Sequence, residues 1–253
     1  MHAPKNRLLA SLEREDRARL IARATSVTFS QKMDVYVAGG PFDYVYFPRS
    51  GLMSTVVVML DGTTAEVATV GSEGMLGMAA SLGATRSVEA VYCQITPCEC
   101  LRLPAAEFAA EAAHGGCLFA EVQTYARGVL TTFARLVACN SLHPVIARCA
   151  RWLLMCGDHM GADEFTVTHE FLGMMLGVRR ASVSVAAGTH RAAGLIDYRH
   201  GKVKILDRPG LERASCECYA VIRDAIPTMG VRVAVPAGNL TLANPDDATP
   251  ADG

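Results

Sequence analysis

The sequence predicts an α+β chain with an N-terminal antiparallel β-roll, one long helix, and a C-terminal helix-turn-helix that carries a β-hairpin wing. Three patterns support this fold class. Short apolar strands separated by glycine turns fill residues 25–103, an amphipathic helix covers 117–139, and two short helices flank a glycine turn within 168–193. With 253 residues the chain is long enough for two modest domains.

These segments predict the domain boundaries. The β-roll and its flanking helices take 1–116, the long helix 117–140 and the winged unit 141–232, and a tail rich in Pro, Gly, Asn and Asp, expected to be disordered, takes 233–253.

The composition is that of a soluble globular protein, with 51% hydrophobic and 19% charged residues. No apolar run reaches transmembrane length and the N-terminal segment is charged, so we expect a cytoplasmic protein without a membrane partner. The formal net charge of -1 gives no overall attraction to nucleic acid. Such attraction would have to come from one local group of basic residues: Arg179, Arg180, Arg191, Arg199, Lys202, Lys204 and Arg208.

The first half of the chain begins with one predicted helix over Leu8–Ala24, and strands follow it. Even spacing of many short strands favours a barrel or double-sheet roll over a parallel sheet. The Asp61-Gly62 pair predicts a tight hairpin. The helix should bury Leu9, Leu12, Leu20 and Ile21, and the strands are expected at Asp34–Val37, Tyr44–Phe47, Met53–Leu60, Ala65–Val70, Ala90–Ile95 and Cys98–Leu103.

A short helix opened by Pro104 and Glu107 and interrupted at Gly115-Gly116 precedes the long helix over Cys117–Cys139. The apolar stripe of the long helix is wider than a helix lying on one small roll needs. A seam shared by two copies in a homodimer accounts for the excess, and the alternative is burial against the chain's own roll. The stripe consists of Leu118, Val122, Tyr125, Val129, Leu130, Phe133, Leu136 and Val137.

The C-terminal unit begins after Asn140-Ser141 with a helix over His143–Met155, whose inward residues are Val145, Ile146, Cys149, Trp152 and Leu153. Thr168 is an N-cap for the next helix, and Gly177 ends that helix. The following helix turns Val183 and Ala186 or Ala187 inward. Its outward residues, Arg179, Arg180, Ser182 and Ser184, favour a DNA-reading helix over a helical hairpin with solvated arginines.

A β-hairpin follows immediately, over Gly194–Asp207, with Gly201 in its turn. Arg199, His200, Lys202 and Lys204 lie near its tip, where cations neutralise phosphates and position a recognition helix. A solvated loop is the alternative interpretation.

Together these elements resemble the Crp/Fnr family of bacterial transcription regulators over Leu8 to Leu211. The resemblance is carried by RCARWLL at 148–154, LGVRRASV at 176–183 and AGLIDY at 193–198. It implies a cyclic-nucleotide-binding-like roll that senses an effector, and a homodimer on a two-fold site in double-stranded DNA. A small-molecule effector and RNA polymerase are the further partners that it implies.

For base contacts, better-known members of the family carry a glutamate and an arginine one turn apart, where this chain has Ala181 and Val185. Because arginine pairs well with guanine edges, Arg180 is the expected base reader, and Arg179 is expected at a base or a phosphate. The remaining expected DNA contacts are Thr168, Ser182, Ser184, Arg199 and Lys202.

Cyclic-AMP-binding members place a glutamate directly after a turn glycine and an Arg-Ser pair further along. Here Met75 follows Gly74, so the carboxylate for the ribose is missing, although Arg86-Ser87 is present. Without its partner, the arginine is left to bind a phosphate or to form a salt bridge. Gly74, Met75, Arg86 and Ser87 are the candidate ligand residues, and control by a cyclic nucleotide is not expected.

The nine cysteines are an odd number and lie mostly in apolar segments, so buried free thiols are expected. Cys98 with Cys100, and Cys216 with Cys218, form C-x-C pairs that lack zinc-finger spacing, and we expect no metal and no cofactor. The first cysteine is Cys93, which excludes an N-terminal iron–sulfur cluster. Two alternatives remain for the roll. A haem-binding sensor is one, with His114 as a candidate ligand, and oxidant sensing by the Cys98 and Cys100 thiols is the other.

Catalytic signatures are missing: the sequence has no Gly-x-Ser-x-Gly, His-Glu-x-x-His or phosphate-binding glycine loop. The sequence therefore predicts a non-enzymatic, dimeric, sequence-specific DNA-binding transcription regulator with an unidentified effector. The alternative is an effector-binding module that acts through protein contacts without specific DNA binding.

Overall fold

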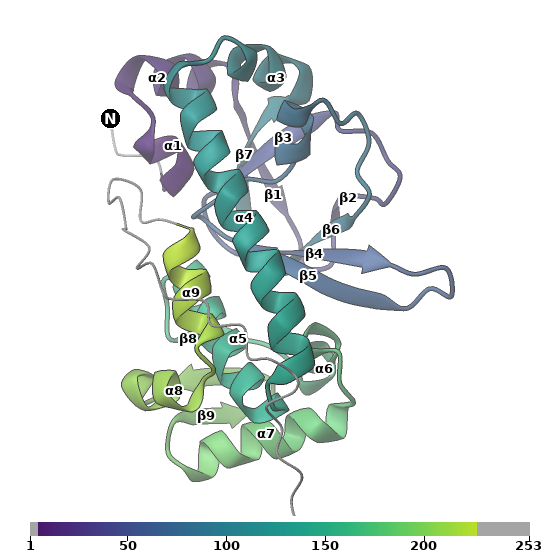
Figure 1. The fold of residues 1–253 in the computed structure, drawn as a ribbon, viewed down its shortest axis with the longest axis vertical. Coiled ribbons are helices and arrows are strands. Elements are labelled where there is room, and N and C mark those ends of the chain that lie inside the picture. The colour runs from purple at the N-terminus through teal and green to yellow at the C-terminus, as the bar shows by residue number, and fades with distance from the viewer. Residues whose placement is uncertain (1–4, 227–253) are drawn as a thin grey trace, which may run out of the picture.

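The computed structural model describes residues 5–226, and Figure 1 shows the predicted order of roll, long helix and winged unit. The roll contains two antiparallel sheets, in the orders β1-β7-β3 and β2-β6-β4-β5. Its strands are β1 Thr25–Phe29, β2 Asp34–Tyr36, β3 Tyr44–Pro48, β4 Leu52–Val58, β5 Thr64–Val70, β6 Ala90–Ile95 and β7 Cys98–Pro104, with a 3-10 turn, η1, at Met78–Leu82.

All six predicted strands are confirmed to within a few residues, and β1 is an additional strand. The β4–β5 hairpin turns at Asp61-Gly62, where Gly62 has a φ of 82° and Asp61 accepts a hydrogen bond from the Thr63 amide at 2.9 Å. Alternation along the strands sends one set of side chains, including Phe47 and Leu103, into the core below the helices.

The predicted helix over 8–24 is wrong as one element, because it forms two: α1 Arg7–Ser11 and α2 Arg14–Arg23. The chain is extended at Leu12, which lets that side chain enter the core beside Leu8 and Leu9. Ile21 was also expected inside but is 37% exposed, because only Leu20 of α2 faces the roll.

Helix α3, Ala105–Ala113, and the long helix α4, Gly116–Leu142, follow as predicted, and α4 runs the length of the molecule from the roll to the C-terminal unit (Figure 1). Tyr125 and Val122 of α4 are buried against the roll. In contrast, Leu130 and Val137 are 66% and 70% exposed. Part of the predicted apolar stripe therefore faces away from the chain's own core.

The C-terminal unit packs a three-stranded sheet, in the order β8-β10-β9, against several helices. Its core is continuous with the roll, because Leu52 and Ile95 of the roll share one buried cluster with Trp152 and Leu153. Ile146 is the exception among the residues predicted to face inward, since it is exposed. The elements are α5 Val145–Met160, β8 Glu164–Thr166, α6 His169–Leu176, α7 Arg180–Ala192, β9 Ile196–Arg199, β10 Lys202–Ile205, α8 Arg208–Ala214 and α9 Cys218–Ala225.

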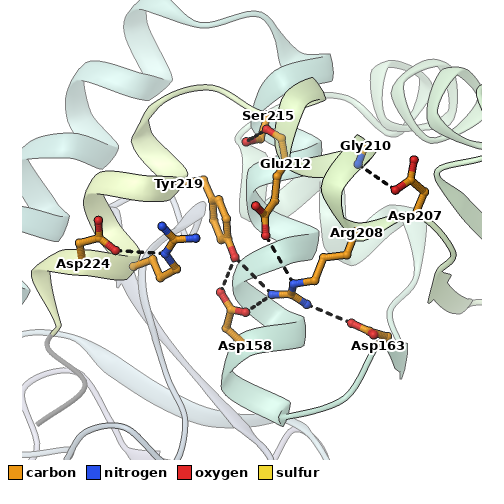
Figure 2. Close-up of polar contacts among 10 residues, drawn as sticks. Asp158, Asp163, Asp207, Arg208, Gly210, Glu212, Ser215, Tyr219 and Asp224 are labelled. Atoms are coloured by element: carbon orange, nitrogen blue, oxygen red, sulfur yellow. Dashed lines mark hydrogen bonds and ion pairs between the residues drawn. The ribbon is translucent and has the colours of Figure 1, made fainter.

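Arg208 ties α5, α8 and α9 together, as Figure 2 shows. Its guanidinium pairs with Asp158, lies 3.0 Å from Asp163 and donates to the Tyr219 hydroxyl at 3.2 Å. Tyr219 in turn donates to Asp158 at 2.9 Å. Arg208 therefore does not belong to the basic group available for DNA, because its charge is already paired within the fold.

Two of the cysteines expected as free thiols form a disulfide instead. Cys93 of β6 and Cys98 of β7 are bonded across a Cα–Cα distance of 6.1 Å. The two strands belong to different sheets and are joined by a short corner, which brings their ends together. The other seven cysteines are free, as expected.

The predicted tail over 233–253 lies outside the described residues. Within residues 5–226, no helix combines the length and the apolar character needed to cross a membrane.

Candidate DNA-binding surface and ligand cavities

The turn between α6 and α7 is built from local signals. The Thr168 hydroxyl caps α6 by accepting a hydrogen bond from the Phe171 amide at 3.2 Å. Gly177 ends α6 with a φ of 61°, a conformation that favours glycine. The chain then re-enters a helix after Arg179, so that α6 and α7 form the predicted helix-turn-helix.

Helix α7 has one buried and one exposed face. Val183, Ala186 and Ala187 are buried, as predicted, whereas Arg179 and Arg180 are exposed at its start. In Figure 1, α7 lies at the end of the molecule farthest from the roll. Because the amides of a helix start and two guanidinium groups point to solvent together, this surface suits an anionic partner.

The two serines of α7 differ in how free they are. Ser182 is half-buried, while Ser184 is exposed. The Ser184 hydroxyl donates to the Arg180 carbonyl oxygen at 3.2 Å and lies 3.1 Å from Nδ1 of His169 on α6. Ser184 therefore joins the two helices of the motif and retains only part of its hydrogen-bonding capacity for a partner.

The wing turns tightly at His200 and Gly201, which have φ values of 50° and 77°. Arg199 and Lys202 face each other across this turn, and both are exposed. The Gly201 carbonyl oxygen accepts from the Val167 amide at 2.8 Å, so the wing tip lies beside Thr168 at the start of α6. Arg199 also pairs with Asp197 at 3.0 Å, which offsets part of its charge.

Sequence reasoning gave no role to Val185, which is 65% exposed and lies one turn of α7 after the exposed Ala181. Exposed apolar side chains on a groove-reading helix contact thymine methyl groups. Its spacing of four from Ala181 was the available signal, but both residues entered only as departures from the family pattern.

The four predicted ligand residues do not form one site. A cavity of 140 Å³ between the roll and α4 is lined by Met75 and Ser87, but not by Arg86. Arg86 is exposed and donates to the Gly39 carbonyl oxygen at 2.7 Å. A Cβ on Gly74 would meet the Tyr125 hydroxyl at 2.2 Å, so Gly74 is needed for the close approach of α4.

A larger cavity, of 270 Å³, lies between β5, α4, α5 and α9, where the roll meets the C-terminal unit. Glu66 of β5 is held there from both sides: Trp152 of α5 donates to it at 3.0 Å and Ser54 donates at 2.7 Å. Burial raises the pKa of Glu66 to about 7, against the effect of these two donors.

Glu73 and His159 form a second link across the same cavity, with Nδ1 of His159 2.8 Å from Oε2 of Glu73. Both side chains are buried. Burial disfavours both charges, but the mutual attraction outweighs it, lowering the pKa of Glu73 and raising the pKa of His159. A Cβ on Gly71 would lie 2.8 Å from Glu73, which explains a glycine at this position.

Two family models match the chain. The cyclic nucleotide-binding domain matches residues 26–114, and the Crp-like helix-turn-helix domain matches residues 147–214. Together they cover more than half of the sequence. A comparison with curated proteins finds no match.

Solved structures of similar fold include FixK2 from Bradyrhizobium japonicum, at a TM-score of 0.67 and 16% identity over 76% of this chain and 98% of that one. The c-di-GMP responsive regulator CLP of Xanthomonas campestris gives 0.62 and 17%, over 76% and 99%. A CRP-family transcriptional regulator from Thermus thermophilus, TTHB099, gives 0.60 and 24%, over 75% and 96%. The chain belongs to the Crp/Fnr family of transcription regulators, with a cyclic nucleotide-binding domain followed by a Crp-like helix-turn-helix, and is not an enzyme.

Proposed function

We propose that two copies of this chain bind a two-fold DNA site in the cytoplasm, each laying α7 in a major groove. The observation that carries the proposal is that Arg179 and Arg180 are exposed at the start of α7, a helix that lies at the end of the molecule farthest from the roll. Arg180 reads a guanine edge, Val185 contacts a thymine methyl, and Ser182 and Ser184 add polar contacts.

The remaining contacts are to phosphates. Thr168 stands at the N-terminus of α6, where backbone amides bind anions, and Lys202 lies next to it on the wing. Arg199 contributes a second wing cation. These groups set the register of α7 without reading sequence.

Dimerisation is proposed through α4, and the boundaries 1–116, 117–140 and 141–232 are proposed on this basis. Four apolar residues of α4 recur at alternating spacings of four and three, which is a coiled-coil seam: Ala126, Leu130, Phe133 and Val137. Leu130 and Val137 of this seam are exposed in the single chain. Two such helices side by side would cover both residues.

Replacing both Leu130 and Val137 with glutamate should convert a dimer into a monomer, because like charges would face each other across the seam. Light scattering after size exclusion should show the mass halving. Leu82→Glu is the matched control, since Leu82 is also exposed but lies on η1 and not on α4. A parent protein that is monomeric at all concentrations would contradict the proposed seam.

Arg180→Ala should weaken specific DNA binding by about 1–3 kcal/mol, roughly 5- to 150-fold, and relax discrimination at one base pair. Genomic fragments selected by the purified protein supply the site, and fluorescence anisotropy over a salt series measures the affinity. Equal affinity of parent and variant would remove Arg180 as the reader.

Lys202→Ala is the companion variant. It should weaken all DNA sequences alike and reduce the salt slope by about one, as expected for a lost phosphate contact. If the parent binds no DNA even at low salt, the chain acts through protein contacts instead.

An effector would act by changing how the roll docks on α5 and α6. The cavity of 270 Å³ lies at this junction, and a ligand that binds one docked arrangement better than another shifts the balance between them. A cyclic nucleotide is not proposed as that ligand, because Arg86 lies outside both cavities. Contact with RNA polymerase is proposed from family membership only.

A further inference from the structure

Four side chains with metal-binding atoms meet where α4 ends and α9 begins. Cys139 lies in the last turn of α4 and His143 is its C-cap residue, while Cys216 precedes α9 and Cys218 is its first residue. All four donor atoms lie within 4.8 Å of one another. The cysteines are buried and the histidine is half-buried.

We propose that these four residues bind one zinc ion. With zinc–nitrogen and zinc–sulfur bonds of roughly 2.0–2.3 Å, the edges of the ligand tetrahedron are roughly 3.3–3.8 Å. The Sγ atoms of Cys139 and Cys216 are 3.4 Å apart, and Sγ of Cys218 is 3.7 Å from Nδ1 of His143. These two donor pairs therefore have the spacing of ligands of a single tetrahedral ion, the remaining pairs lie within 4.8 Å, and a Cys₃His set suits a closed structural zinc site.

The histidine is oriented for this role. Its Nδ1 faces Cys218, and its Nε2 lies 3.1 Å from the carboxylate of Glu217. A carboxylate on the distal nitrogen is the usual outer partner of a zinc-bound imidazole, because it keeps the proton on the atom that faces away from the metal.

The charge of the surroundings supplies an independent argument. Arg148 and Arg151 of α5 are buried, and among residues 5–226 neither forms an ion pair. The Nε of each is buried without a hydrogen-bond partner. Buried cations need a counter-charge. Zinc bound by three thiolates and one neutral imidazole carries a net charge of -1. That negative charge would lie near Arg148 and Arg151, which both interact electrostatically with Cys139.

Two other occupants fit less well. A disulfide between Cys139 and Cys216 would involve only two of the four residues. It would not explain why Cys218 and His143 lie at the same place. An iron–sulfur cluster spreads its four protein ligands over two or more irons, so ligands on different irons stand farther apart than the ligands of one ion.

The site would fasten α9 to the junction of α4 and α5, which joins the proposed dimer helix to the DNA-binding unit. Helix α9 is also held by Arg208, which donates a hydrogen bond to the hydroxyl of Tyr219, the residue after Cys218 (Figure 2). Zinc removal should therefore weaken DNA binding about tenfold. This consequence rests on the proposed function, whereas metal binding does not.

The test is the metal content of the full chain, purified without a metal-binding tag. We expect one zinc per chain, lost in Cys139→Ala, Cys216→Ala and Cys218→Ala, and kept in the control variants Cys149→Ala and Cys156→Ala, whose cysteines are buried outside the cluster. Glu217→Gln should weaken zinc affinity by about 10–100-fold, whereas Glu170→Gln, exposed on α6, should not.

A cobalt titration keeps the proposal falsifiable if a variant does not fold. The parent chain, stripped with a chelator, should take up one Co²⁺ with the absorption bands of tetrahedral thiolate coordination. Failure to bind cobalt or zinc would overturn the site, as would iron with acid-labile sulfide or a Cys139–Cys216 disulfide under reducing conditions. If zinc binds but the loaded protein binds no DNA, the proposed function fails and the zinc site stands.

Discussion

His159→Ala should lower the free energy of unfolding by about 3–5 kcal/mol near pH 6, because it leaves the buried Glu73 carboxylate without its counter-charge. Glu73 retains one hydrogen bond, from the Gly71 amide at 2.8 Å. One such bond does not offset the cost of a buried, unpaired charge. Urea denaturation of the parent and the variant measures the difference.

The pH dependence of the pair follows from its two shifts. The lowered pKa of Glu73 contributes stability above the ordinary value of 4.5, and that stability is lost as the pH falls through the folded pKa. The raised pKa of His159 contributes stability below the ordinary value of 6.5, and that stability is lost as the pH rises through the folded pKa. Both contributions are fully present between pH 4.5 and 6.5.

Two further variants separate the ion pair from other effects. Glu73→Gln in the His159→Ala background should recover part of the lost stability, because the unpaired charge is then removed. His114→Ala is the matched control, since His114 is exposed on the roll. An equal loss in the control, or no loss in His159→Ala, would show that the pair does not hold the two units together.

Glu66→Gln should have the opposite effect to His159→Ala, because it should raise the free energy of unfolding at pH 8. The pKa of Glu66 is raised from 4.5 to about 7, so the folded state loses stability as the pH rises through this range. This pKa shift corresponds to a stability loss of at most about 3 kcal/mol, and to a smaller loss where water in the cavity reaches the carboxyl group. Glutamine retains an acceptor for Trp152 and has no charge to bury.

The same variant should change little at pH 4.5, where the parent carboxyl is neutral in the folded chain. Glu13→Gln is the control, since that side chain is exposed and makes no capping hydrogen bond. Arg151 and His159 face Glu66 and favour its charged form, so the experiment is done with both intact. Equal free energies of unfolding for the parent and Glu66→Gln at pH 8 would mean that Glu66 carries no burial penalty.

The helix-turn-helix and its wing could be predicted from the sequence because their signals are local. Thr168 caps α6, Gly177 ends it, and Gly201 turns the wing, each acting on residues a few positions away. The β4–β5 hairpin at Asp61-Gly62 belongs to the same class. For the same reason the position of Arg180 at the exposed start of α7 could be predicted from helical periodicity.

The residues predicted to bind a ligand show the limit of such reasoning. Met75 and Ser87 line a cavity, whereas Arg86 is exposed and donates to the Gly39 carbonyl oxygen, 47 positions away in the sequence. The prediction of one helix through Leu12 was wrong because the chain is extended at that residue, although the side chain is buried as predicted.

Local signals along the chain were enough to establish the order of the elements, the resemblance to the family and the exposed face of α7, since periodicity and caps act within a few residues. Which distant groups meet became known only from the packing of the folded chain. Glu66 and Trp152 are 86 positions apart, and Cys139 and Cys216 are 77 apart. No local rule connects such pairs, because their contact depends on how the roll, α4 and α9 pack together.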